Sequence, residues 1–248
     1  VIKRKRGYRF RIITLLIFLQ NYFDEKLIDR LTAIEGMKSI SINQNTKKTN
    51  VILGDVTKCI WGDPYITDMI HLRDTKDFSL TDTAVAYHIS PQSFYQVNPV
   101  QTEKLYSLAL DYAGLTGKEK VIDAYCGTGT IGLIAASQAK EVIGVEIVEE
   151  AVTAAKENAE ANGLTNCSFL AGDVLKVIDE IEEKPDFIVL DPPREGIHPK
   201  ALPKIVDLYR CEKMLYISCK PTSLARDLVE FAKYGYRVEK VCCVDMFP

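Results

Sequence analysis

From Gly117 onward, short apolar runs alternate with segments in which apolar residues recur every three or four positions. The runs have the length and the β-branched content of buried strands, and the longer segments have the period of amphipathic helices. This alternation predicts an α/β fold with a mostly parallel sheet and helices on both faces. The predicted strands are 119–125, 141–147, 167–173, 186–193, 213–219 and 236–247, and the predicted helices are 130–139, 149–162, 174–181, 199–209 and 221–234.

The first ninety residues lack this regular pattern. They predict a strand from Arg9 to Leu19, a helix from Tyr22 to Ile34, and short strands around Ser39, Val51, Ile60, Tyr65 and Tyr87. We therefore expect a smaller α+β region over residues 1–92, part of a central domain, and a second domain over residues 93–248.

The composition is that of a folded protein, with 47% hydrophobic and 26% charged residues among 248. A net charge of −3 gives no support to binding nucleic acid through bulk charge. An RNA partner would need a local patch, such as the basic run from Val1 to Arg11, although such a run is more often a solvated edge.

Seven cysteines, none in a C-x-x-C pair, give no metal-site spacing and favour a reducing, cytoplasmic compartment. The longest apolar stretch, from Ile12 to Leu19, is too short to cross a bilayer and is predicted to be a core strand.

A glycine-containing turn follows the strand that ends near Asp123, and it carries Gly127 and Gly129. Glycines at this point let a ligand approach the backbone at the carboxyl edge of the sheet. Glu146 ends the next predicted strand, where an acidic residue can bind a ribose diol. Because the third glycine of a dinucleotide fingerprint is missing, we favour S-adenosylmethionine over an NAD-type ligand.

Two further acids end predicted strands. Asp173 could accept a hydrogen bond from an adenine amine or could cap the helix that follows it. Asp191 precedes two prolines, which make a stiff loop beside the place where a methyl group would be presented.

Cys219 stands where a predicted buried strand runs out into a loop, whereas a packing cysteine prefers the middle of an apolar segment. Lys220 and the start of the helix opened by Pro221 would favour a thiolate at this place. Four other cysteines are expected to be packing residues: Cys126, Cys167, Cys242 and Cys243.

Five segments together resemble the RNA uracil-5-methyltransferases, a class I, Rossmann-like family dependent on S-adenosylmethionine. They are SFYQVNP (93–99), DAYCGTGTIGL (123–133), GVEIVEEAV (144–152), VLDPPREG (189–196) and YISCKPTSLARD (216–227). The resemblance implies cofactor contacts from Gln96, Tyr125, Glu146 and Asp191. It also implies methylation at carbon 5 of a uridine in RNA, in 23S rRNA in preference to tRNA, through a Cys219 adduct at carbon 6.

In that family a glutamate after a DMFP-like sequence removes the proton from carbon 5, so this base and a seventh strand are expected beyond Pro248. We also expect the natural protein to extend at both ends. Two alternatives stay open. One is an amino-group or other nucleobase methyltransferase. An amino-group enzyme would need no nucleophilic cysteine and would carry an aromatic residue where Arg194 stands. The other is a fragment that binds the cofactor or RNA without catalysis.

Overall fold

The computed structural model describes residues 12–18, 25–45, 53–54, 56–177, 181, 184–209 and 211–247. The chain divides into two compact units. The first comprises residues 1–68 and 88–93, and the second comprises residues 69–87 and 94–248. The basic run at the start of the chain and the strand predicted around Val51 lie outside the described residues.

The first unit contains a three-stranded sheet in the order β1-β2-β3. Strand β1 (Ile12–Phe18) is parallel to β2 (Met37–Gln44), which is antiparallel to β3 (Val56–Gly62), and α1 (Glu25–Thr32) connects the first two. The strand predicted from Arg9 to Leu19 and the helix predicted from Tyr22 to Ile34 are confirmed over the residues that the structure describes. The buried Asn43 side chain bonds both the N–H and the C=O of Gly54, and so closes the chain between β2 and β3.

Strands β4 (Ile66–Arg73) and β5 (Leu80–Ile89) pair with each other and run from one unit into the other. Within the second unit, the Tyr87 hydroxyl donates to the Thr130 carbonyl at 2.8 Å. The Asn162 side chain bonds the N–H and the C=O of Ala86, as a neighbouring strand would. Thr130 begins one helix of this unit and Asn162 follows another, so these contacts fasten the end of β5 to the helices that cover the larger sheet.

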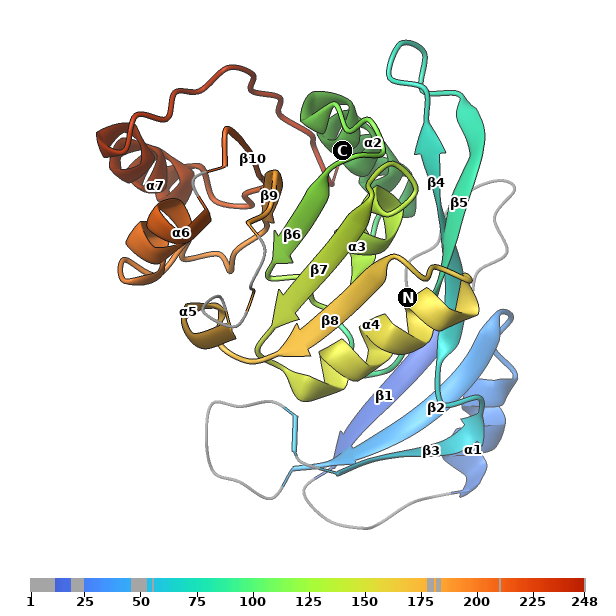
Figure 1. Cartoon of the computed structure of the whole chain (residues 1–248). Coiled ribbons are helices and arrows are strands. Elements are labelled where there is room, and N and C mark those ends of the chain that lie inside the picture. The colour runs from blue at the N-terminus through green and yellow to red at the C-terminus, as the bar shows by residue number, and fades with distance from the viewer. Residues whose placement is uncertain are drawn as a thin grey trace. The chain divides into compact units, whose positions relative to one another are not determined.

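The second unit is built on a five-stranded sheet in the order β10-β9-β6-β7-β8, and every pairing in it is parallel. The arrowheads of β6, β7 and β8 point to the same edge in Figure 1. The strands are β6 (Lys120–Ala124), β7 (Glu141–Glu146), β8 (Cys167–Ala171), β9 (Phe187–Leu190) and β10 (Lys213–Tyr216). The strand order reverses between β6 and β9, which is where ligands bind in open sheets of this kind.

Helices cover both faces of this sheet, as predicted. One face carries α2 (Pro99–Ala113), α3 (Thr130–Ala135) and α4 (Glu149–Ala161). The other carries α5 (Val174–Val177), α6 (Ala201–Tyr209) and α7 (Pro221–Lys233). The sequence analysis assigned no element to α2, which Asn98 caps by accepting from the Gln101 N–H.

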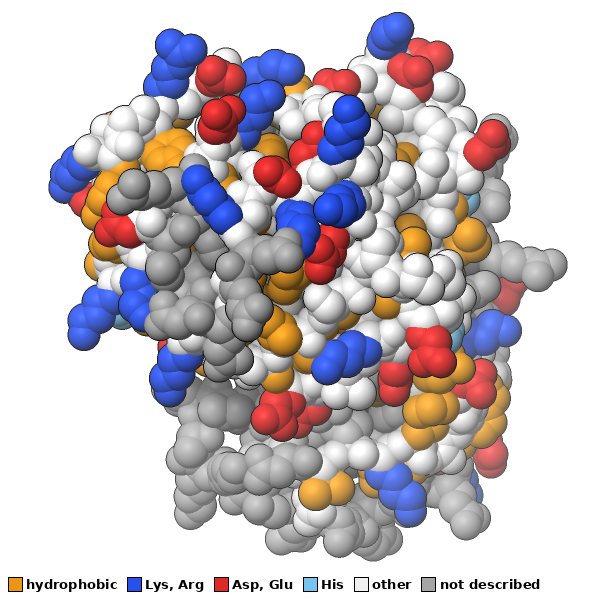
Figure 2. Space-filling model, in the orientation of Figure 1, with side chains coloured by type: hydrophobic (Ala, Val, Ile, Leu, Met, Phe, Trp, Pro, Cys, Tyr) orange, Lys and Arg blue, Asp and Glu red, His pale blue; other side chains and the backbone are white. Residues whose placement is uncertain are grey.

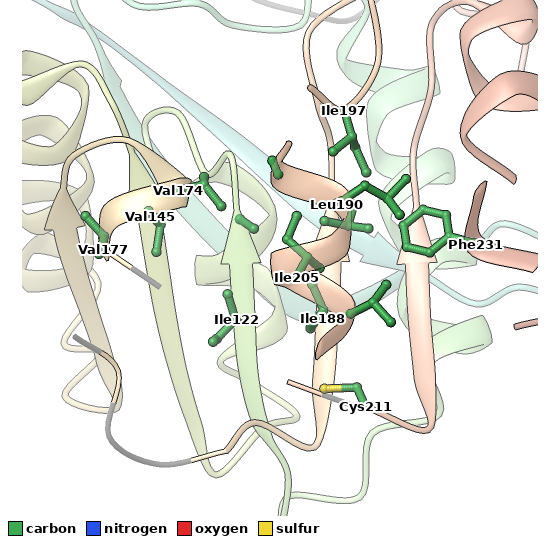
Figure 3. Packing of buried hydrophobic residues seen from close by; sticks show 14 residues of the cluster. Ile122, Val145, Val174, Val177, Ile188, Leu190, Ile197, Ile205, Cys211 and Phe231 are labelled. Atoms are coloured by element: carbon green, nitrogen blue, oxygen red, sulfur yellow. The ribbon is translucent and has the colours of Figure 1, made fainter. Parts of the chain in front are cut away.

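Side chains on alternate strand positions fill the space under α5, α6 and α7. Figure 3 shows Ile122 of β6 and Ile188 and Leu190 of β9 packed against Ile205 of α6 and Phe231 of α7. All five are buried. The alternate residues of β6 therefore point to the opposite face, toward α2 and α3.

Gly144 marks a close approach on that opposite face. A Cβ atom at this position would collide with the Phe169 ring and would lie 2.8 Å from Cys126 Sγ. The glycine lets the loop after β6 sit directly on β7, which brings the ends of the two strands together.

The strand predicted over residues 236–247 is wrong. Residues 236–245 are irregular and mostly exposed, and this includes Cys242 and Cys243, which were expected to pack. A strand needs a hydrogen-bonded neighbour, and no described strand pairs with this segment. Instead, the Asn98 and Gln101 side chains hold its end through the carbonyls of Met246 and Asp245.

No helix in the described part of the chain is long and apolar enough to cross a membrane. Within the same residues, no group of three or more His, Cys, Asp and Glu side chains is arranged to hold a metal ion.

Candidate active site at the carboxyl edge of the sheet

The candidate site residues that follow strands meet at one edge of the five-stranded sheet. In spatial order, Cys219 follows β10, Asp191 follows β9, Tyr125 follows β6, Glu146 ends β7 and Asp173 follows β8. The parallel pairing explains this, because parallel strands present their carboxyl ends at the same edge. Gln96 lies half-buried in the loop before α2.

Glu146 holds the glycine loop in place. Its Oε2 accepts from the Gly127 N–H at 3.0 Å, and its Oε1 accepts from the Val148 N–H at 3.0 Å. Each carboxylate oxygen can accept a further hydrogen bond. Glu146 can therefore shape the loop and still bind a hydroxyl group.

Tyr125 has a positive φ of 145°, a region that a residue with a side chain rarely occupies. Such strain is found where surrounding structure or function requires it. Burial first, and then the charges of Asp173 and Asp227, raise the pKa of the Tyr125 phenol to about 12. The half-buried ring therefore lies close to acids that follow β8 and belong to α7.

Asp173 caps the helix that follows it, which was one of the two roles considered for it. Its Oδ1 accepts from the Leu175 N–H at 2.9 Å at the start of α5. A carboxylate has two oxygens, so this capping contact leaves the other oxygen able to accept from an adenine amine.

A buried acid, Asp123, and a half-buried acid, Asp191, lie close together beside the strand-order reversal. Asp123 is 1% exposed, and burial followed by the charge of Asp191 raises its pKa to about 7. Burial raises the pKa of Asp191 to about 6. Oδ2 of Asp123 accepts from the Gly132 N–H at 3.0 Å, while Oδ1 is buried without a hydrogen bond. An acceptor in this state is suited to a ligand that donates or carries positive charge.

The sequence analysis did not select Asp123 as a site residue, nor Tyr106 of α2. Burial, and then the charges of Asp191 and Asp123, raise the pKa of the Tyr106 phenol. The Tyr106 ring therefore lies near the same two acids. An acid as the last polar residue of the strand before a glycine loop was the available signal for Asp123. Tyr106 gave none, because α2 was not predicted.

We expect the paired acids to make the stability of the ligand-free chain depend on pH. Both folded-state pKa values exceed the ordinary 3.8, so the folded chain binds these protons more tightly than the unfolded chain. The stabilisation is complete below about pH 4 and is lost as the pH rises through about 6 and 7. Relative to Asp123→Asn, the free energy of unfolding should fall by about 2–4 kcal/mol over this range.

Urea unfolding of both proteins between pH 4.5 and 7.5 measures this difference. Asp111→Asn, at an exposed position of α2, is the control and should follow the parent chain. Parallel stability curves for the parent chain and Asp123→Asn would show that Asp123 is already ionised at low pH.

Cys219 is exposed, as the sequence analysis expected for a residue placed to be reached. The Ile217 N–H donates to the Leu190 carbonyl, so β9 and β10 stay paired up to the turn that carries the thiol. Ser218 closes this turn through a bond between its Oγ and the Lys220 N–H at 3.2 Å. The ammonium of Lys220 pairs with the carboxylate of Glu195 at 3.1 Å.

Three other cysteines are poorly suited to be nucleophiles. Burial raises the pKa of Cys126, raises that of Cys167 to about 11 and raises that of Cys211 to about 12. A thiol with a raised pKa holds its proton at neutral pH, and only the thiolate reacts.

A cleft of about 310 Å³ lies elsewhere in the second unit, between the end of α4 and the start of β8. Its lining includes Glu160, Leu164 and Cys167. Because Cys167 begins β8, this cleft opens at the amino edge of the sheet, away from the acids and Cys219. The candidate site residues lie instead at the carboxyl edge of the sheet.

On the face shown in Figure 2, Lys and Arg side chains are interspersed with Asp and Glu over the described residues. This agrees with the net charge of −3 and with a ligand that is recognised through specific contacts.

Comparison with known proteins gives consistent results. The sequence profile of the tRNA (uracil-5-)-methyltransferase family matches residues 65–248. An uncharacterized RNA methyltransferase of Clostridium acetobutylicum is 47% identical over 88% of this chain and 45% of its own length, and one of Halalkalibacterium halodurans is 48% identical over 90% and 46%. The chain thus spans about half the length of these relatives.

A solved structure is also similar over most of the chain. It is the Pyrococcus abyssi tRNA (uracil-54, C5)-methyltransferase in complex with S-adenosyl-L-homocysteine, with a TM-score of 0.72 and 26% identity. The match covers 96% of this chain and 53% of that one.

Proposed function

Because the chain belongs to the tRNA (uracil-5-)-methyltransferase family, we propose that it methylates carbon 5 of a uridine in RNA and that S-adenosylmethionine is the methyl donor. The observation that carries the proposal is the exposed thiol of Cys219, which lies at the same sheet edge as Asp123, Asp191 and the glycine loop. The sequence analysis favoured rRNA as the substrate, whereas the names of the family and of the Pyrococcus abyssi enzyme mention tRNA. Both kinds of RNA are therefore candidate substrates.

The residues at this edge suit S-adenosylmethionine. The ligand carries an ammonium and a sulfonium, and Asp123 offers a buried oxygen that has no partner. It also carries ribose hydroxyls and an adenine amine, and Glu146 and Asp173 keep acceptor capacity for them. We assign the binding site to Gln96, Asp123, Tyr125, Gly127, Glu146, Asp173 and Asp191.

When bound, S-adenosylmethionine supplies an electrophilic methyl group. Carbon 5 of uracil is too weakly nucleophilic to accept it directly, so Cys219 first adds to the ring. The Sγ–C6 bond forms, and the electron pair of the C5=C6 bond moves into an enolate with carbon 5 as its nucleophilic atom. Carbon 5 takes the methyl group as the methyl–sulfur bond breaks, and S-adenosylhomocysteine would be the leaving group. Carbon 5 then loses its proton, the C5=C6 bond forms again, and the C6–Sγ bond breaks to return the thiolate.

The target uridine must leave its stack to reach the thiol, as for other enzymes that act on a ring atom. The proton acceptor is assigned to none of residues 1–248, because the resemblance places it after the DMFP sequence.

RNA containing 5-fluorouridine tests the proposal directly. Fluorine replaces the proton at carbon 5, so the adduct cannot resolve after methyl transfer. We expect a protein–RNA adduct that survives denaturing electrophoresis and depends on S-adenosylmethionine, with either tRNA or 23S rRNA transcripts as the substrate.

The two alternatives give different results in this experiment. An amino-group methyltransferase would label RNA with methyl groups but form no adduct. A non-catalytic binding protein would retain RNA or cofactor and give neither product. Either result would refute the Cys219 mechanism.

A further inference from the structure

The loop that carries Asp191 and the helix that follows Cys219 are joined by several contacts. The Ser223 hydroxyl donates to the Arg194 carbonyl at 3.0 Å. The Arg226 guanidinium donates to the Glu195 carbonyl at 2.7 Å. Two consecutive carbonyls of the 191–197 loop thus bond side chains from the first two turns of α7.

Asp227 is the buried centre of these contacts. Its side chain is 2% exposed. Oδ2 accepts from the Ile197 N–H at 2.8 Å and from the Tyr216 hydroxyl at 2.7 Å. Oδ1 accepts from Nε and Nη2 of Arg226 at 2.9 and 2.8 Å. One carboxylate therefore binds the end of the Asp191 loop, the last residue of β10 and the arginine that holds the Glu195 carbonyl.

Gly196 shows how closely the loop approaches this carboxylate. It has a φ of +81°, and a Cβ atom here would lie 2.5 Å from Oδ2 of Asp227 and 2.6 Å from Nη2 of Arg226. A residue with a side chain would have to push the loop away from α7. The contact thus depends on a glycine at this position as well as on the buried acid.

The exposed ion pair between Lys220 and Glu195 joins the same two segments, but the Glu195 side chain is 81% exposed. Solvent and salt screen a pair of this kind, so it constrains the geometry little. Asp227 is enclosed, accepts from four donor groups and carries a charge-assisted bond, which is the stronger arrangement. The relative placement of the two segments therefore depends mainly on Asp227.

We propose that Asp227 is a positioning residue for methyl transfer, which fixes the Cys219 turn against the Asp191 loop so that thiol and methyl donor address the same base. This proposal rests on the proposed function. Asp227 is buried behind the site and acts through its neighbours. Reactions of this kind are sensitive to placement, and a shift of about 1 Å can cost on the order of 100-fold in rate.

The test compares Asp227→Asn and Ser223→Ala with the intact parent protein. Asp227→Asn keeps the shape but sets an amide against Arg226 or Ile197, and Ser223→Ala removes only the contact to the Arg194 carbonyl. Glu230→Gln, also on α7 and paired with Lys233 at the surface, is the control. Three quantities are measured: the rate of adduct formation with 5-fluorouridine RNA, the rate of Cys219 alkylation by iodoacetamide, and hydrogen exchange at the Ile197 amide.

For Asp227→Asn we expect adduct formation to slow by about 30- to 100-fold, alkylation to stay within about twofold, and the Ile197 amide to exchange faster. Ser223→Ala should slow adduct formation by about three- to tenfold. If Asp227→Asn does not fold, the comparison of Ser223→Ala with the parent protein decides the test. Glu230→Gln should match the parent in all three measurements.

The proposal is overturned if the folded variants form the adduct at the parent rate. It is also overturned if alkylation and adduct formation fall together, because Asp227 would then govern the thiol's reactivity or the fold as a whole. A parent protein that forms no adduct would instead refute the proposed function. Unchanged hydrogen exchange at the Ile197 amide in Asp227→Asn would separately show that Asp227 does not hold the Asp191 loop.

Discussion

Replacing Cys219 by alanine should abolish uridine methylation, with a loss on the order of 10⁴-fold or more, as for other covalent nucleophiles. Without the thiolate, carbon 5 is not converted into an enolate carbon and cannot take the methyl group. The side chain is exposed, so the free energy of unfolding should change by less than about 0.5 kcal/mol. Transfer of labelled methyl groups to RNA measures the activity, and calorimetry measures cofactor binding, which should be retained.

Cys242→Ala is the matched control, because it removes another exposed thiol, one that lies beside Tyr112 near the end of α2. It should keep full activity and form the 5-fluorouridine adduct. If Cys219→Ala still methylates uridine while Cys242→Ala is impaired, the nucleophile has been assigned to the wrong cysteine.

Replacing Glu146 by alanine should weaken binding of S-adenosylmethionine by about 100-fold or more. A hydrogen bond to a charged group contributes about 1.5–3 kcal/mol, and the carboxylate can offer one to each hydroxyl of a ribose. The same change releases the Gly127 and Val148 amides, which loosens the glycine loop. Titration calorimetry with the intact protein gives the dissociation constant directly.

Two variants sharpen this measurement. Glu146→Gln keeps one acceptor oxygen and should lose only about tenfold in affinity. Glu149→Ala changes an exposed acid three residues later and should leave binding unchanged. Equal affinities for the parent, the alanine variant and the glutamine variant would mean that the ribose is bound elsewhere.

The sequence was sufficient to predict the parallel sheet and the edge where the candidate site lies. Buried parallel strands need near-continuous apolar runs, and each run here ends at or just before a residue that could bind a ligand or react. Since parallel strands share their carboxyl edge, Glu146, Asp191 and Cys219 could be grouped before any coordinates were known.

Features that depend on contacts distant in the sequence could not be predicted in this way. The apolar residues of 236–247 suggested a strand, but pairing requires a neighbour that the pattern does not reveal. Asp227 appeared only as the last residue of the YISCKPTSLARD segment, and its role could not be predicted because two of its donors, Tyr216 and Ile197, lie 11 and 30 residues away along the chain. Likewise, the unpartnered oxygen of Asp123 follows from packing around it and not from its neighbours in sequence.

Because of the strand order, the two halves of the site require loops of different lengths to be closed during folding. Strands β6, β7 and β8 are joined in succession, so the glycine loop and Glu146 arise from neighbouring crossovers. Strand β9 returns to β6 only after the chain from Ala124 to Phe187 has been folded back, and β10 adds to β9. Loop-closure entropy grows with the length closed. The half of the site that carries Asp191 and Cys219 thus depends on the pairing that costs the sheet most conformational entropy.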